Sequence, residues 1–135
     1  MWEEIDWSKY KVFGQPDIAK AIHQLFSNDY ASRMDGWHQI SIQLEWSYIN
    51  LECELASVLI PVLIELLLID AIPDKSSLVD LLIVSASHYK KNLDDKYQKH
   101  AISLRDIVCK GLDTYKKLDQ NLLDIDFLIR LCNEV

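Results

Sequence analysis

The sequence has few residues that turn or break a chain, with three glycines and three prolines in 135 residues. β-Sandwiches and β-barrels need many tight turns, so this scarcity argues against both architectures. Disorder is also excluded, because 50% of the residues are hydrophobic and 26% are charged. Leu, Ile, Lys, Asp and Glu dominate, a mixture that favours helices. At this length we expect a single domain, residues 1–135.

Long hydrophobic runs are absent as well. The longest covers residues 58–69 and is interrupted by Pro61 and Glu65, so it is too short to cross a membrane. The acidic start lacks the basic head and apolar stretch of a signal peptide. Three cysteines, an odd number, lie in segments with apolar periodicity, and we expect all of them to be free core thiols: Cys53, Cys109 and Cys132. These features predict a cytoplasmic protein.

Cations are too few to balance the acids. There are 14 Lys and Arg residues against 21 Asp and Glu, a net charge of −7. Such a balance argues against direct binding to nucleic acid or to an anionic membrane, and it suits a basic protein partner. Residues 87–118 are locally basic, with eight cations and four anions, but the two signs alternate at spacings that allow pairing along a helix.

The spacing of apolar residues predicts about six antiparallel helices in a short stack or bundle, an all-α fold. We expect Pro61 to bend or restart the third helix. The fourth is apolar almost all round and should lie centrally, with Asn92 at its end. The expected helices cover residues 17–26, 30–49, 52–69, from 76 or 77 to 89, 94–115 and 121–133.

No recognisable catalytic or metal-binding motif occurs in the sequence. The four histidines are scattered, and none pairs with a cysteine or a second histidine at ligand spacing. There is no nucleophile elbow and no glycine-rich phosphate loop, and adjacent acids are typical of a solvated helix face. We therefore predict no catalytic residue, no metal and no cofactor. A helical enzyme with an unrecognised pocket stays open as an alternative.

The acidic stretch over residues 37–86 has one cation and seven anions, and two interpretations compete for it. The acids are either solvated helix faces or a docking face for a basic protein. Aromatic residues among charges favour the second, although a tryptophan at helical spacing is more often part of the core. The candidate partner-binding residues are Trp37, Glu45, Trp46, Glu52, Glu54, Asp70 and Asp74.

Four short motifs resemble a family of small bacterial HEAT-repeat-like proteins. They are a Trp-rich acidic start with Ile5-Asp6-Trp7, a Phe13-Gly14 turn, a helix that begins at Asp17-Ile18, and the Ile-Pro-Val-Leu-Ile-Glu-Leu-Leu helix at residues 60–67. The similarity covers roughly residues 2–88. What it implies is a HEAT-like right-handed stack of helices without catalysis of its own.

Many members of that family resemble immunity proteins, which bind and block antibacterial toxins, including those of contact-dependent growth inhibition. The resemblance therefore implies an immunity-type protein. Because the chain is acidic, we expect its toxin to be a basic nuclease, bound by a monomer in a one-to-one complex. The alternative is a general HEAT-like scaffold or adaptor that joins other proteins. Fold resemblance alone does not separate these functions.

Overall fold

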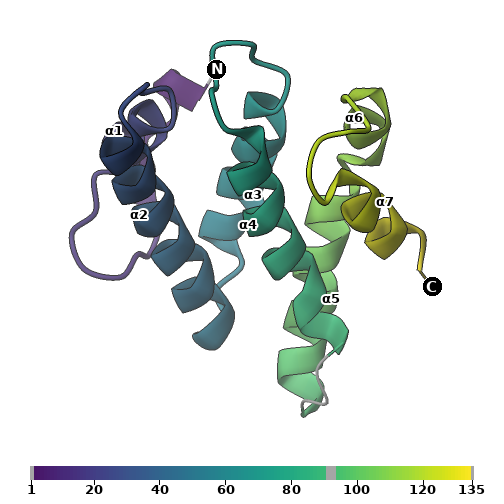
Figure 1. Ribbon diagram of the computed structural model, residues 1–135. Helices are drawn as coiled ribbons and strands as arrows, with labels where there is room; N and C mark the ends of the chain where they lie inside the picture. The colour runs from purple at the N-terminus through teal and green to yellow at the C-terminus, as the bar shows by residue number, and fades with distance from the viewer. Residues whose placement is uncertain (1, 91–93, 135) are drawn as a thin grey trace.

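The computed structural model describes residues 2–90 and 94–134 and shows an all-α protein (Figure 1), as predicted. Within these residues there are seven α-helices, three short 3-10 helices and no strand. The α-helices are α1 (Ile18–Gln24), α2 (Tyr30–Ile49), α3 (Glu54–Leu66), α4 (Lys75–Ser87), α5 (Asp95–Cys109), α6 (Leu112–Lys117) and α7 (Ile125–Asn133). The 3-10 helices are η1 (Trp2–Glu4), η2 (Trp7–Lys9) and η3 (His88–Lys90).

Aspartates begin four of the α-helices. In each case the side chain accepts a hydrogen bond from a backbone N–H of the first turn, which satisfies a donor that the helix itself leaves unpaired. The caps are Asp17, Asp29, Asp74 and Asp94. The fourth helix was expected to begin at residue 76 or 77, but Asp74 caps α4, and both serines lie in its first turn.

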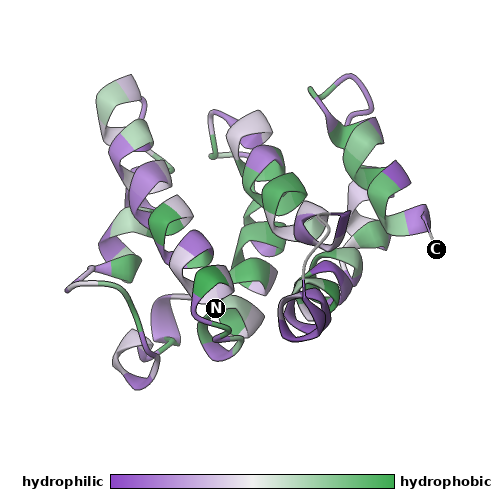
Figure 2. Ribbon diagram, turned by 90° about the horizontal axis from the view of Figure 1, so that it is seen from below, coloured by the Kyte–Doolittle hydropathy of each residue, from purple (hydrophilic) through white to green (hydrophobic). Residues whose placement is uncertain are grey.

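Helices α3 and α4 form the centre of the molecule. α4 contacts α2, α3, α5 and α7, which confirms the central place predicted for it. Figure 1 shows the helices following one another across the molecule in chain order, from α1 and α2 to α6 and α7. The two central helices carry more hydrophobic residues than α5 does (Figure 2). Fully buried core side chains include Ile22, Leu59, Leu63, Leu66, Leu78, Leu82, Leu104 and Tyr115.

The expected fifth helix is divided into α5 and α6 at Gly111. The buried Tyr115 side chain folds back, and its hydroxyl donates a hydrogen bond to the Val108 carbonyl at 2.7 Å. A Cβ at Gly111 would lie 2.7 Å from the Tyr115 hydroxyl oxygen, closer than such atoms approach. Only glycine therefore fits at this close contact, and the break adds one helix to the six predicted.

Helix α3 runs through Pro61, an exposed position, without interruption, so of the predicted bend or restart the restart is excluded. It also ends earlier than expected, at Leu66 rather than near residue 69. The predicted helix end at Asn92 lies outside the described residues. None of the helices in the described part of the chain is both long enough and apolar enough to cross a membrane.

The prediction of three free thiols was wrong for two cysteines. Cys109 at the end of α5 and Cys132 in α7 form a disulfide, with their Cα atoms 5.2 Å apart. Packing of α7 against α5 brings together residues that are 23 positions apart in the sequence, within the range that a disulfide spans. Only Cys53 is a free thiol. The cysteines therefore no longer support the argument for a reducing compartment.

Candidate partner-binding surface

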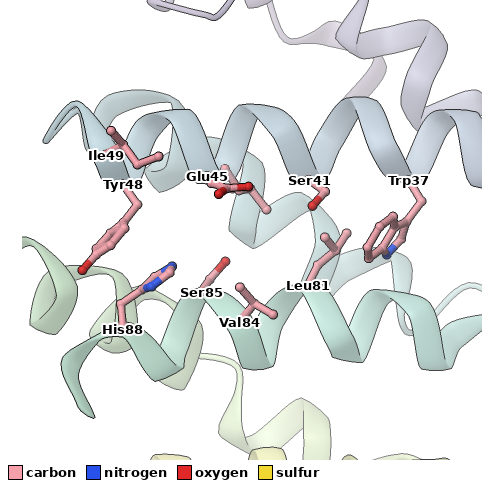
Figure 3. Close-up of a pocket in the computed structure, with 10 residues that line it drawn as sticks. Trp37, Ser41, Glu45, Tyr48, Ile49, Leu81, Val84, Ser85 and His88 are labelled. Carbon is pink, nitrogen blue, oxygen red and sulfur yellow. The ribbon is translucent and has the colours of Figure 1, made fainter. Parts of the chain in front are cut away.

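Helices α2 and α4 lie side by side and leave an open groove between them, with a volume of about 380 Å³. Figure 3 shows Trp37 and Leu81 at one end of this α2–α4 groove and Tyr48 and His88 at the other, with Glu45 between them. Helix α2 contributes residues at steps of three and four, the spacing that places side chains on one helix face. The lining residues are Trp37, Ser41, Leu44, Glu45, Tyr48, Ile49, Leu81, Val84, Ser85 and His88.

Trp37 both makes a contact within the fold and lines the groove. Its indole N–H donates a hydrogen bond to the Ser77 carbonyl at 2.9 Å, which fixes the ring between α2 and the first turn of α4. The ring also borders a second hollow of about 430 Å³ toward α7, and Val84 lines both hollows. Trp37 is therefore only partly buried, and a partner can reach it without any rearrangement of the core.

An aromatic stack closes the other end of the groove. The Tyr48 and His88 rings lie parallel, with centroids 3.6 Å apart and an interplanar angle of 7°. The His100 ring lies 6.0 Å from that of Tyr48 on the same cluster. Burial, and then the charges of Tyr97 and Asp94, raise the pKa of the Tyr48 phenol, so it stays neutral. The tyrosine at this end of the groove is accordingly uncharged.

Exposed apolar side chains gather around the groove. Val84 is 59% exposed, Ile49 is 54% exposed, and Phe127 of α7 is 41% exposed beside the second hollow. Phe13 and Ile42 line a third, smaller hollow, of about 180 Å³, which shares Glu45 and Ile49 with the groove. Single exposed hydrophobic residues are ordinary, but a contiguous group of them marks an interaction surface.

The charged residues that line these hollows are all acidic. Glu45 lines the groove, and Asp80 and Asp124 line the hollow toward α7. Burial, and then repulsion from Asp124 and Asp74, raise the pKa of the Asp80 carboxyl. The Arg130 guanidinium lies 5.8 Å from the Phe127 ring centroid and pairs with Asp126. The α2–α4–α7 face is the name used below for this surface, made of Trp37, Ser41, Glu45, Ile49, Asp80, Ile83, Val84, Asp124 and Phe127.

Three of the seven residues that the sequence suggested lie on or next to this face. Trp37 and Glu45 line the groove, and Trp46 lines the adjoining small hollow. Two other acids line none of the three hollows: Glu52 forms an ion pair with Lys11 at 3.3 Å, and Asp74 caps α4, where it repels Asp80. The remaining two, Glu54 and Asp70, are exposed but line none of the three hollows.

Sequence reasoning missed Ile49, Asp80, Val84, Asp124 and Phe127. A signal for Val84 was present, because a helix that is apolar all round leaves some apolar side chains uncovered unless neighbours surround it completely. Asp124 had no such signal. It follows the loop after α6 and approaches Asp80 only because α7 packs on α4.

A possible catalytic pair lies away from the face. The Cys53 Sγ and the His100 Nδ1 are 2.9 Å apart, the separation of a nucleophile and its base. Burial, and then Glu52, raise the pKa of the Cys53 thiol, and burial lowers the pKa of the His100 imidazole. Both shifts favour the neutral forms, so the thiol lacks the thiolate character of a reactive cysteine. Neither residue lines a hollow of the α2–α4–α7 face.

No group of three or more His, Cys, Asp or Glu residues within residues 2–90 and 94–134 is arranged to hold a metal ion. What the α2–α4–α7 face offers chemically is apolar area, an indole ring and carboxylates. Such groups are suited to burial against another molecule and to pairing with its charges. Comparison with protein families, with curated proteins and with solved structures finds no match to this chain.

Proposed function

We propose that this chain is an immunity-type protein that binds and neutralises a basic antibacterial toxin, most simply a nuclease, through its α2–α4–α7 face. The observation that carries the proposal is the combination on that face of exposed apolar side chains with acids and no lining lysine or arginine. A nuclease needs a positive cleft for phosphates, and an acidic face competes for that cleft.

The apolar and the acidic residues of the face should contribute to binding in different ways. Trp37, Val84 and Phe127 supply area that loses contact with water when a partner binds, and this supplies most of the affinity. Glu45, Asp80 and Asp124 speed the encounter with a basic surface and disfavour acidic ones. The net charge of −7 acts in the same direction at longer range.

The direct test is co-expression with the product of the neighbouring gene. We expect a one-to-one complex that relieves the neighbour's toxicity. The variant Glu45→Lys should reduce this protection, whereas the matched variant Glu65→Lys, at an exposed position in α3 away from the face, should not. A neighbour that is neither toxic nor bound would contradict the immunity function.

A further inference from the structure

We propose that the part of the partner that occupies the α2–α4 groove is a cationic amphipathic α-helix of about three turns. The proposal rests on the function above only in taking the ligand to be a protein. It assigns the shape and charge of the recognised element, which the function itself leaves open.

The walls of the groove are two α-helices, whose backbone N–H and C=O groups are used within each helix. No strand, and so no sheet edge, occurs in the described part of the chain, which removes β-strand addition as a binding mode. An extended segment buried in this apolar groove would leave some of its own backbone N–H and C=O groups without partners, which is unfavourable. A helix satisfies its backbone internally and avoids that cost.

The length of the groove matches a short helix. Along α2 it runs from Trp37 to Ile49, twelve residues apart, which is roughly 18 Å at a rise of about 1.5 Å per residue. A helix laid along it presents side chains three and four positions apart on one face. About three turns would therefore place apolar side chains against Trp37, Val84 and Ile49 in succession.

The acidic residues at the rim of the groove indicate that its occupant is positively charged. Glu45 lies midway along the groove, and Asp80 and Asp124 lie beyond the Trp37 end, in the hollow that shares Trp37 and Val84 with it. Among the described residues none of these three acids forms an ion pair within the chain. Lysine or arginine on the flanks of a bound helix would pair with them.

A second copy of this chain is a poorer occupant. Self-association through the face would bring two sets of the same three acids together, on two chains that each carry a net charge of −7. Nucleic acid is disfavoured by the same carboxylates, which repel phosphates. A basic helix of another protein is the occupant that relieves the charge and covers the apolar area at once.

The test uses a synthetic 14-residue peptide of leucine and lysine, with the leucines on one helical face. A second peptide has the same composition in an order that spreads the leucines around the helix. We expect the first peptide to bind and to gain helical circular dichroism on binding. The second should bind about tenfold more weakly, the loss that corresponds to about 1.4 kcal/mol.

Matched variants of the protein locate the binding. Val84→Asn should weaken binding of the amphipathic peptide by about tenfold, and Ile102→Asn, at another exposed mid-helix position, should not change it. Glu45→Lys should weaken it and Glu65→Lys should leave it within twofold. Circular dichroism and thermal unfolding of each variant show whether the fold is kept.

Three results would overturn the proposal: equal affinity for both peptides, binding without a gain in helicity, or binding that Val84→Asn and Glu45→Lys leave unchanged. Sedimentation that shows a dimer disrupted by Val84→Asn would assign the groove to a second copy instead. A toxin complex that depends on Glu45 while neither peptide binds would keep the proposed function and reject the helix. A bound peptide without a toxin would do the reverse.

Discussion

On the α2–α4–α7 face, Glu45, Asp80 and Asp124 stand beside exposed apolar side chains, whereas the charges around α5 and the end of α7 are held by contacts within the fold. There Glu134 accepts hydrogen bonds from Lys90 at 2.8 Å and from the Tyr89 hydroxyl at 2.9 Å. The Arg105 guanidinium lies 4.8 Å from the Tyr89 ring centroid.

The charged side chains of these two regions have different roles. In the C-terminal region they join η3, α5 and the end of α7, so their removal should cost stability. On the face, burial and repulsion from Asp124 and Asp74 make ionised Asp80 unfavourable, and Glu45, Asp80 and Asp124 are left available to a partner. The unfolding of four variants tests how the C-terminal region is held together and whether Asp80 of the face opposes folding.

The largest effect should come from the disulfide that ties α7 to α5. The double variant Cys109→Ala with Cys132→Ala should lose about 3 kcal/mol of unfolding free energy, because the disulfide restricts a 23-residue separation in the unfolded chain. Urea unfolding with and without reductant measures the loss. Reductant should lower the midpoint of the unaltered protein and leave that of the double variant unchanged; equal midpoints for all samples would contradict the role given to this bond.

Arg105→Met should have the next largest effect. The guanidinium donates hydrogen bonds to the carbonyls of Leu131 and Glu134 and packs on the Tyr89 ring, and a methionine keeps only the packing. The loss should be about 2 kcal/mol, the range for hydrogen bonds from a charged group. Lys99→Met, at an exposed position of the same helix, is the control and should stay within about 0.5 kcal/mol of the unaltered protein.

A smaller effect, and one that depends on pH, is expected for Glu134→Gln. The hydrogen bond from Lys90, and then that from Tyr89, lower the pKa of the Glu134 carboxyl, so its contribution is present above its ordinary pKa of 4.5 and lost as the pH falls through the lowered value. The variant should therefore melt slightly lower at pH 7 and match the unaltered protein at pH 2 to 3. A difference that is the same at both pH values would argue against the ionic contact.

The smallest effect should have the opposite sign. Burial, with repulsion from Asp124 and Asp74, raises the pKa of the Asp80 carboxyl, so its ionised form opposes folding above that pKa. The opposition disappears as the pH falls below the ordinary value of 3.8. Asp80→Asn should therefore gain stability at pH 7, less than about 0.5 kcal/mol after solvent screening. A loss of stability at pH 7 would show that Asp80 is a structural residue.

The sequence predicted the elements of the fold well where the signals are local. The second expected helix, residues 30–49, has the same bounds as α2, because its signals are local: the Asp29 cap directly before it and the apolar spacing within it. The division of the fifth helix and the Cys109–Cys132 disulfide could not be predicted in this way. The division depends on the Tyr115 side chain folding back onto Val108, and the disulfide depends on the packing of α7 against α5. The spacing of apolar residues shows neither contact.

The candidate site shows the same limit. Trp37 and Glu45 were recognised from composition and spacing on one helix, and both line the groove. Counting acids along the chain could not separate Glu52, which pairs with Lys11, from Asp80, which stands on the face. Tertiary packing decides which carboxylates form ion pairs or caps within the fold and which are exposed on the face.

The most direct test of the account compares two charge reversals in the complex with the neighbouring gene product. Glu45→Lys with Asp80→Lys changes the face, and Glu52→Lys with Glu54→Lys makes the same change in net charge at the start of α3. Association rates should be measured by stopped flow over a range of salt concentrations.

The account predicts that the first pair slows association about tenfold at low salt and flattens its salt dependence. The second pair should leave the rate close to that of the unaltered protein. Slow association for the second pair with an unchanged rate for the first would contradict the assignment of the α2–α4–α7 face and place the contact at the start of α3.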